Sequence, residues 1–532
     1  NSFCTLLGQT PTMQVNRSNF DSIVGELKEI LRTCEFYSVD QEMTGISVPD
    51  GVSESPLASL AEVYPSKRAA ALRYNAFQIG ICTFHRENES TPTYTVRPFN
   101  FWLCNRGQSN ADVTLNMSAV SFLLNNRMDF QQWLRDGLPY ANDSTASSVR
   151  RSRELVHTNA LNVEDREWVD AAFEKIAAWH RTNESPTWEG TLGHVSHAAD
   201  VALFHKLYAA DVFVQAEPDL LSNTPPWKRQ TTKIQRCESA DNQRCLARAR
   251  DSANRSAAHC LGFREVWETL IELKGKPQLG HNYSSDLMFL EAMHGAGLPA
   301  SFDAFCDQVH DHFPRIYDTK SLAASIDIGV QLISTSLEPL FNALEQLADR
   351  PFTLKFPLGF ESYSPSVVKA ACGGNAAVAH QGAYDAYMTG VVFLHYSLRF
   401  PSQTRELENI ISVFGSAYQT VLGRAGGDRA RILPGKFFVL ETPVLVGKAA
   451  VDVALRTDEE RKMSESERRK FPPPFSIWAC PESHRVFVLH LKPGHEFRRD
   501  RIPEDVNVTP LEQWSSLSLP SWKRTRAEAG SS

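Results

Sequence analysis

The segment that decides the fold is Phe36-Tyr37-Ser38-Val39-Asp40-Gln41-Glu42-Met43. Its first half is rich in aromatic and β-branched residues, which is typical of a strand, and its second half carries two acids. Because side chains alternate along a strand, Asp40 and Glu42 would project from one face, about 7 Å apart. Two carboxylates held so close repel each other. The pattern therefore indicates either a site for hard divalent cations or two solvated acids at an exposed strand end.

Two further segments place polar side chains at the starts of predicted helices. In Gly280-His281-Asn282 a strand ends in a sharp turn, and Asp286 follows at a helix start. In His380-Gln381-Gly382-Ala383-Tyr384-Asp385 the histidine precedes a helix and Asp385 lies in its first turns, so an imidazole and a carboxylate can converge. Taken singly, Asp286 is also explained as an acid favoured by the helix dipole, and His380 as a surface or capping residue.

The remaining chain mixes helical and strand-like patterns. Apolar residues recur at helical spacing after Ser18, and β-branched and aromatic residues mark the strand candidates. The predicted helices or helix-rich stretches cover residues 18–32, 118–135, 287–294, 321–398 and 405–422, and the predicted strands cover 76–84, 94–103, 437–442, 475–479 and 485–491.

Composition narrows the class of protein. A chain of 532 residues suggests two to four domains at about 150 residues each. A formal net charge of −7 argues against coating nucleic acid by bulk electrostatics, so any such contact must be local. No apolar run reaches the roughly 18 to 20 residues of a membrane span, and ten cysteines without a CxxC pair favour a reducing compartment.

The order of the motifs is more specific than any one of them. With D-x-E, then GHN and a downstream Asp, then H-x₄-D, the chain resembles the poly(A)-specific ribonuclease (PARN) family of DEDDh 3′–5′ exonucleases. The likeness covers residues 13–150 and 262–395. It is carried by the blocks MQVNRSNF (13–20), FYSVDQEMTGI (36–46), FQIGICTF (77–84), FNF (99–101), DFQQWLRDGLPY (129–140), GHN (280–282), FPRIYDTK (313–320) and HQGAYDAYMTG (380–390).

The resemblance implies an α/β fold. We expect a ribonuclease-H-like mixed sheet with flanking helices and antiparallel first strands, an inserted small module and a C-terminal α+β region. The expected segments are residues 13–150 and 262–445 for the two parts of the nuclease domain, 151–261 for the inserted module and 446–532 for the C-terminal domain or extension.

The resemblance also implies the chemistry. Asp40, Glu42, Asp286 and Asp385 would hold two Mg²⁺ ions, with Mn²⁺ as a substitute, and His380 would act as general base. The reaction would release 5′-AMP from the poly(A) 3′ ends of single-stranded RNA. Relatives work as homodimers, so we expect a homodimer, with the cytoplasm as the first location and the nucleus as the second.

Substrate contacts are implied for Met43, Ile46 and Lys320. Family members often have Gly and Phe flanking the second acid, where this chain has Gln41 and Met43. An aromatic ring there could stack on a base, whereas Met43 offers a softer contact, which weakens the expectation of a strict adenine preference.

Two other functions are compatible with the sequence. One is 3′-end trimming of small RNAs, although such relatives tend to lack the middle module and to end in a membrane anchor. The other is a catalytically inactive RNA-binding homologue. Inactive relatives usually lose a metal-binding acid, and this chain keeps all four acids and the histidine.

Overall fold

The computed structural model describes residues 13–49, 51, 55–88, 92–105, 112–126, 128–148, 161–182, 187–191, 199, 202–203, 206–207, 210, 212, 214–216, 231–236, 261–329, 332, 334–364, 381–423, 429–464, 475–481, 483, 485–493 and 495–514. No helix among them is long and apolar enough to cross a membrane.

The acid-bearing strand lies inside a seven-stranded mixed sheet of order β1-β4-β3-β2-β8-β9, with β10 also pairing with β4. β2, β3 and β4 are antiparallel neighbours, and the other pairs are parallel. This arrangement confirms the predicted mixed sheet with antiparallel first strands. The strands are β1 (Met13–Val15), β2 (Phe36–Met43), β3 (Ala76–Asn88), β4 (Thr93–Trp102), β8 (Gln278–Gly280), β9 (Ile316–Asp318) and β10 (Thr353–Lys355).

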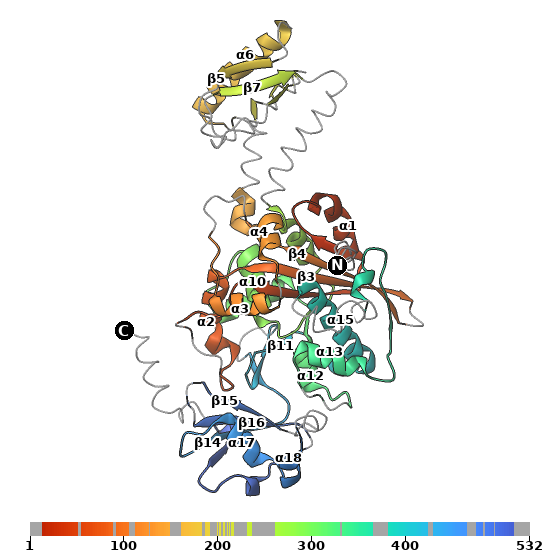
Figure 1. The fold of residues 1–532 in the computed structure, drawn as a ribbon, viewed down its shortest axis with the longest axis vertical. Helices are drawn as coiled ribbons and strands as arrows, with labels where there is room; N and C mark the ends of the chain where they lie inside the picture. Colours follow the sequence, from red (N-terminus) through yellow and green to blue (C-terminus); the bar gives the residue numbers. More distant parts are fainter. Residues whose placement is uncertain are drawn as a thin grey trace, which may run out of the picture. The chain divides into compact units, whose positions relative to one another are not determined.

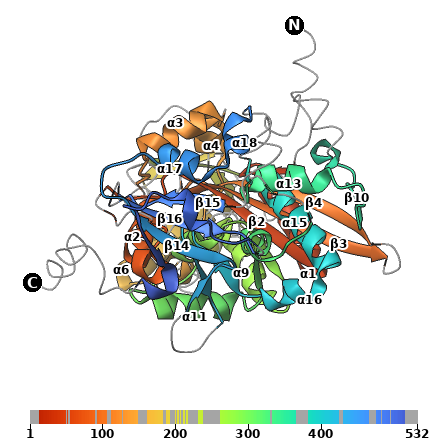
Figure 2. The same cartoon turned by 90° about the horizontal axis from the view of Figure 1, so that it is seen from below.

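Helices flank this sheet, and one of them is central to the core. α15 (Gly382–Arg399) contacts β2, β3 and β4 (Figure 1). Every residue from Gly382 to Tyr396 is buried. A helix that is buried all round needs cover on its outer side as well, and α13 (Leu337–Glu345) supplies part of it (Figure 2). Besides these two, residues 13–138 and 264–406 contain the helices α1 (Phe20–Thr33), α2 (Leu60–Arg73), α3 (Met117–Asn125), α4 (Phe130–Asp136), α9 (Arg264–Glu272), α10 (Ser284–His294), α11 (Phe302–His312), α12 (Thr319–Ser325), α16 (Pro401–Glu406) and the 3₁₀ helix Glu361–Tyr363.

The predicted helix over residues 405–422 is wrong. α16 ends at Glu406, and Asn409 then adopts a left-handed backbone conformation with φ of 63°. Strands β11 (Ile410–Ser412) and β12 (Tyr418–Val421) follow and pair antiparallel, and β13 (Ala430–Ile432) completes their sheet. The β-branched residues of this stretch therefore follow their strand propensity.

A four-stranded antiparallel sheet of order β15-β16-β14-β17 forms the C-terminal part. The predicted strands over 437–442, 475–479 and 485–491 correspond to β14, β15 and β16. The elements are β14 (Lys436–Glu441), β15 (Phe475–Ala479), β16 (Val486–Leu491), β17 (Asn507–Pro510), α17 (Lys448–Leu455), α18 (Asp458–Lys462) and the 3₁₀ helices Arg499–Arg501 and Leu511–Gln513.

Residues 105–110 and 139–265 form a separate compact unit. Its described part contains α6 (Val163–Thr182) and an antiparallel sheet of order β5-β7-β6. Val169, Ile176 and Leu203 belong to its core. The strands are β5 (Thr187–Thr191), β6 (Val214–Ala216) and β7 (Thr231–Arg236). The division of the chain into four functional segments stays a prediction.

Candidate active site

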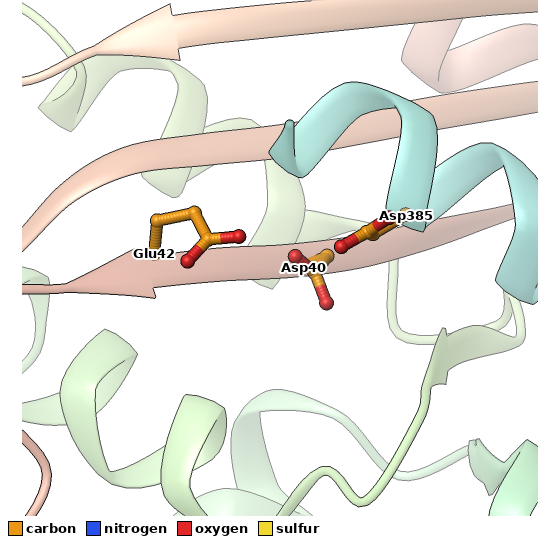
Figure 3. A group of neighbouring side chains, drawn as sticks. All are labelled: Asp40, Glu42 and Asp385. Carbon is orange, nitrogen blue, oxygen red and sulfur yellow. The ribbon is translucent and has the colours of Figure 1, made fainter. Parts of the chain in front are cut away.

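Two carboxylates of β2 and one of α15 meet where β2 passes the start of that helix. One oxygen each of Asp40, Glu42 and Asp385 lies within 4.8 Å of the other two. Figure 3 shows the two acids of β2 on the same face as the helix turn that carries Asp385. The alternation of the strand thus places Asp40 and Glu42 on one face, as the sequence predicts.

Polar side chains of the sheet fix the start of α15. The first N–H groups of a helix have no partner within the helix. Here the N–H of Gly382 donates to Gln78 Oε1 at 2.8 Å, and the N–H of Ala383 donates to Asn100 Oδ1 at 3.4 Å. The Ser38 hydroxyl donates to the Ala386 carbonyl at 2.5 Å. These bonds hold the first turn, which includes Asp385, against the strands.

Asp286 lies in the first turn of α10, outside the group of three. Its Oδ1 accepts the backbone N–H of Gln41 at 3.1 Å, and its backbone carbonyl accepts the Gln41 side-chain amide at 2.8 Å. The fourth acid is therefore tied to the residue between Asp40 and Glu42.

A fifth acid, Asp318, organises the chain around the start of α10. Its buried carboxylate accepts the backbone N–H groups of Asn282 (2.9 Å), Tyr283 (3.1 Å), Lys320 (2.9 Å) and Ser412 (2.8 Å). Asn282 has φ of 58°, the left-handed turn conformation that asparagine tolerates better than most residues. Asp318 thus fixes the turn that leads from β8 into the helix of Asp286.

The electrostatics of the acids follow from burial and mutual repulsion. Burial, Asp385, Asp286 and Glu42 raise the pKa of Asp40 well above its usual range. Burial, Asp385 and Asp286 do the same to the pKa of Glu42. Burial raises the pKa of Asp286 to about 8, although the N–H groups that its carboxylate accepts oppose the change. Asp286 therefore acts electrostatically on both acids of β2.

The donor set fits a hard divalent cation. Several carboxylate oxygens converge in a half-buried place where each negative charge disfavours the others, and a cation would remove that repulsion. Oxygen-only ligands suit Mg²⁺ and Mn²⁺ rather than softer metals. Asp40, Glu42 and Asp385 are the residues that could hold such an ion directly, with Asp286 beside them.

The remaining predicted site residues have different surroundings. Met43 ends β2 directly after an irregularity in its pairing with β3, a feature that can redirect a side chain. Ile46 is 57% exposed. Lys320 lies at the start of α12 with its Nζ 5.9 Å from the ring centre of Phe414, which is 54% exposed. His380 lies outside the described residues.

From the sequence, Gln41 was named only as a departure from the family beside the second acid, and Asp318 and Asn100 were not singled out. Asp318 carried a local signal, because an acid directly before Thr-Lys at a helix start is an N-cap candidate. Gln41 and Asn100 carried none, since their partners are hundreds of residues away in the chain.

Comparison with known proteins bears on this arrangement of acids. Residues 15–393, the greater part of the chain, match the family described as CAF1 family ribonuclease. The chain belongs to this family. The matched segment begins in β1 and ends in α15, so it includes all four acids.

Several relatives of this chain are named poly(A)-specific ribonuclease. The zebrafish (Danio rerio) PARN is 27% identical over 409 residues, covering 72% of this chain and 59% of its own. The human PARN is 23% identical, covering 72% of this chain and 61% of its own. The mouse PNLDC1 is 24% identical, covering 72% and 70%. The chain thus spans about 60% of the length of the PARN relatives that it matches.

Two solved structures are also similar to this chain. The S. pombe Pop2p structure in its Mg²⁺- and Mn²⁺-bound form shares 13% identity at a TM-score of 0.36, covering 76% of this chain and 99% of that one. The RNase domain of yeast Pop2 shares 11% identity at a TM-score of 0.34, covering 78% and 94%.

Proposed function

We propose that this protein is a Mg²⁺-dependent 3′–5′ exoribonuclease that shortens poly(A) tails and releases 5′-AMP. The observation that carries the proposal is the convergence of Asp40, Glu42 and Asp385 within 4.8 Å, with Asp286 tied to the same strand. Membership of a ribonuclease family and relatives named poly(A)-specific ribonuclease support the same reaction class and substrate.

Two divalent cations at such a site supply the positive charge that stabilises the attacking and leaving oxygens of a phosphoryl displacement. Asp40, Glu42, Asp286 and Asp385 hold them, and the ionised form of each acid is favoured once cations are present. Mn²⁺ can replace Mg²⁺, because both prefer oxygen ligands.

His380 acts as the general base. It takes a proton from the attacking water while the water oxygen forms its bond to phosphorus. The bond between phosphorus and the 3′-oxygen of the remaining RNA breaks, and that oxygen gains a proton to become a new 3′-hydroxyl. The products are 5′-AMP and an RNA shorter by one nucleotide.

Met43, Ile46 and Lys320 contact the RNA. Lys320 donates to a phosphate oxygen, and the neighbouring exposed ring of Phe414 offers a surface on which a base can stack. Burial lowers the pKa of Lys320, whereas the Asp318 carboxylate favours its charged form. Because Met43 replaces an aromatic residue, adenine is preferred rather than strictly required.

The test is a 3′-exonuclease assay with Mg²⁺ on labelled A-tailed and mixed-sequence RNA. Wild type should shorten the A-tailed RNA faster and release 5′-AMP, and Asp40→Ala should do neither. Equal cleavage by both proteins would refute the assigned chemistry. Equal rates on both RNAs would remove the poly(A) preference and favour general 3′-end trimming, and RNA binding without cleavage would indicate an inactive homologue.

We further propose that the protein is a homodimer and acts in the cytoplasm, with the nucleus as a second location. Light scattering after size-exclusion chromatography tests the first point. A single species at the mass of one chain, 59.6 kDa, at micromolar concentration would contradict it. Fractionation of cells that express the protein tests the second.

A further inference from the structure

Gln41 links the strand of two acids to the helix of the fourth. Gln41 lies between Asp40 and Glu42 on β2. Because side chains alternate along a strand, its side chain points away from the face that carries the two acids. Both its main chain and its side chain reach Asp286. The backbone N–H donates to Asp286 Oδ1 at 3.1 Å, and Nε2 donates to the Asp286 carbonyl at 2.8 Å.

The main-chain bond arises from the end of a strand. β8 pairs with β2 only at Tyr37 and Ser38 and ends at Gly280, which leaves the edge of β2 uncovered beyond that point. The N–H of Tyr37 donates to the Pro277 carbonyl along this edge. Further along β2, the N–H of Gln41 donates to the Asp286 carboxylate instead of to a carbonyl of a neighbouring strand. Any residue type at position 41 except proline could make this bond.

The side-chain bond depends on glutamine. Gln41 is 6% exposed, and only its NH₂ end can face the Asp286 carbonyl, because Oε1 would bring two acceptors together. Oε1 is buried and has no partner among the residues that the structure describes. A buried acceptor left unpaired costs about 1–3 kcal/mol, which offsets part of the stability that the Nε2 bond contributes.

We propose that Gln41 is a positioning residue for Asp286. Its amide fixes the first turn of α10 relative to β2, so that the Asp286 carboxylate stays in register with Asp40 and Glu42. This inference rests on the proposed function, because the register matters only if the four acids act on the same cations. Groups that orient the ligands of a metal site typically change its affinity or activity about 10- to 100-fold when they are removed.

The experiment compares Gln41→Met with Gln419→Met. Methionine keeps the length and unbranched shape of glutamine but cannot donate. Gln419 is the matched control, because it is also a buried glutamine in a strand, and its Nε2 donates to Ser325 Oγ at 3.4 Å. Both variants lose a buried amide donor, but only one of these donors reaches an acid of the site.

Three quantities are measured for each protein: the melting temperature in EDTA, the Mn²⁺ concentration at half of the cation-induced rise in melting temperature, and kcat and KM on A-tailed RNA. For Gln41→Met we expect the Mn²⁺ midpoint to rise about 10-fold and kcat to fall, with KM for RNA unchanged. For Gln419→Met we expect a lower melting temperature in EDTA and an unchanged Mn²⁺ midpoint.

Gln41→Gly is a second variant, for the case in which methionine does not fit. Glycine retains the main-chain bond and creates no packing conflict. A wild-type Mn²⁺ midpoint in a folded Gln41 variant would overturn the inference and leave the proposed function intact. A midpoint that also rises in Gln419→Met would overturn it as well. If wild type shows neither cation-induced stabilisation nor cleavage, both the inference and the proposed function fail.

Discussion

Gly80 of β3 and Gly382 of α15 touch backbone to backbone. A Cβ atom on Gly80 would lie 1.9 Å from both the carbonyl carbon and the carbonyl oxygen of Gly382, and one on Gly382 would lie 2.8 Å from the Gly80 nitrogen. Gly80 is also the register partner of Asp40 on the neighbouring strand. These two glycines therefore set how closely the helix of Asp385 approaches the strand of Asp40.

Replacing Gly80 by alanine should separate these two elements. The added methyl group has no room, and overpacking a core costs typically about 1–3 kcal/mol. We expect Gly80→Ala to lower the free energy of unfolding by this amount and to reduce kcat on A-tailed RNA. Gly25→Ala in α1 is the control, because nothing lies within 4 Å of its Cβ position. Wild-type stability and kcat in Gly80→Ala would contradict the close approach.

Neutralising an acid of the site should stabilise the protein while it removes activity. Burial and the neighbouring acids disfavour the charged form of Asp40, so Asp40→Asn relieves repulsion when no cation is bound. We expect a higher melting temperature than wild type in EDTA, by about 2–4 °C for each 1 kcal/mol gained. Adding Mg²⁺ should stabilise wild type more than the variant, and cleavage should fall by more than about 100-fold. A variant less stable than wild type in EDTA would show that the acids do not repel each other.

His395 of α15 should make stability depend on pH. Burial lowers the pKa of His395, whose Nδ1 accepts an N–H from Arg399 at 2.7 Å and whose Nε2 lies 3.2 Å from Glu345 Oε1. Because the unfolded chain, with a histidine pKa of about 6.5, binds the proton more readily than the folded state, stability is lost as the pH falls below that value.

We expect His395→Gln to reduce the loss of unfolding free energy between pH 7 and pH 5, by at most about 1.4 kcal/mol per pH unit. Glutamine keeps a donor and an acceptor without titrating. The exposed His495 supplies the control variant His495→Gln, which should retain the wild-type slope. Chemical denaturation at a series of pH values measures both, and an identical slope in all three proteins would refute the prediction.

Met43 should limit the preference for adenine. Stacking of a base on an aromatic side chain is worth about 1–3 kcal/mol, and part of this energy differs between bases. We expect Met43→Phe to raise the ratio of kcat/KM for A-tailed over mixed-sequence RNA by roughly threefold to tenfold. Met43→Leu keeps an aliphatic side chain and should leave the ratio unchanged. A ratio that rises equally in both variants would exclude stacking as the cause.

Local patterns predicted much of the sheet and of the site. The alternation of residues 36–43 placed Asp40 and Glu42 on one face of a strand, and the helix start signals placed Asp286 and Asp385 in first turns, where the structure has them. The same reasoning was wrong over residues 405–422. There the apolar residues fit the spacing of a helix as well as that of a strand, and pairing with another strand decides between the two structures.

What the sequence did not reveal depends on contacts between distant segments. The approach of Gly80 to Gly382 involves two glycines that look ordinary in their own surroundings, and the bond from Gln41 to Asp286 joins residues with no local relation. Neither periodicity nor propensity carries information about such pairs. They arise only when β8, which leads into α10, pairs beside β2 and when α15 packs against β2 and β3.

Asp318 gathers main-chain groups from the turn before α10, from α12 and from β11, and it lies outside the group of Asp40, Glu42 and Asp385. Suppose that members of this family are judged active from the four acids and the histidine alone. A protein that has lost Asp318 would then be counted as intact. In such a lineage, decay of the enzyme would begin at a residue outside its diagnostic signature. The four acids would then disappear later, after selection on them had already ended.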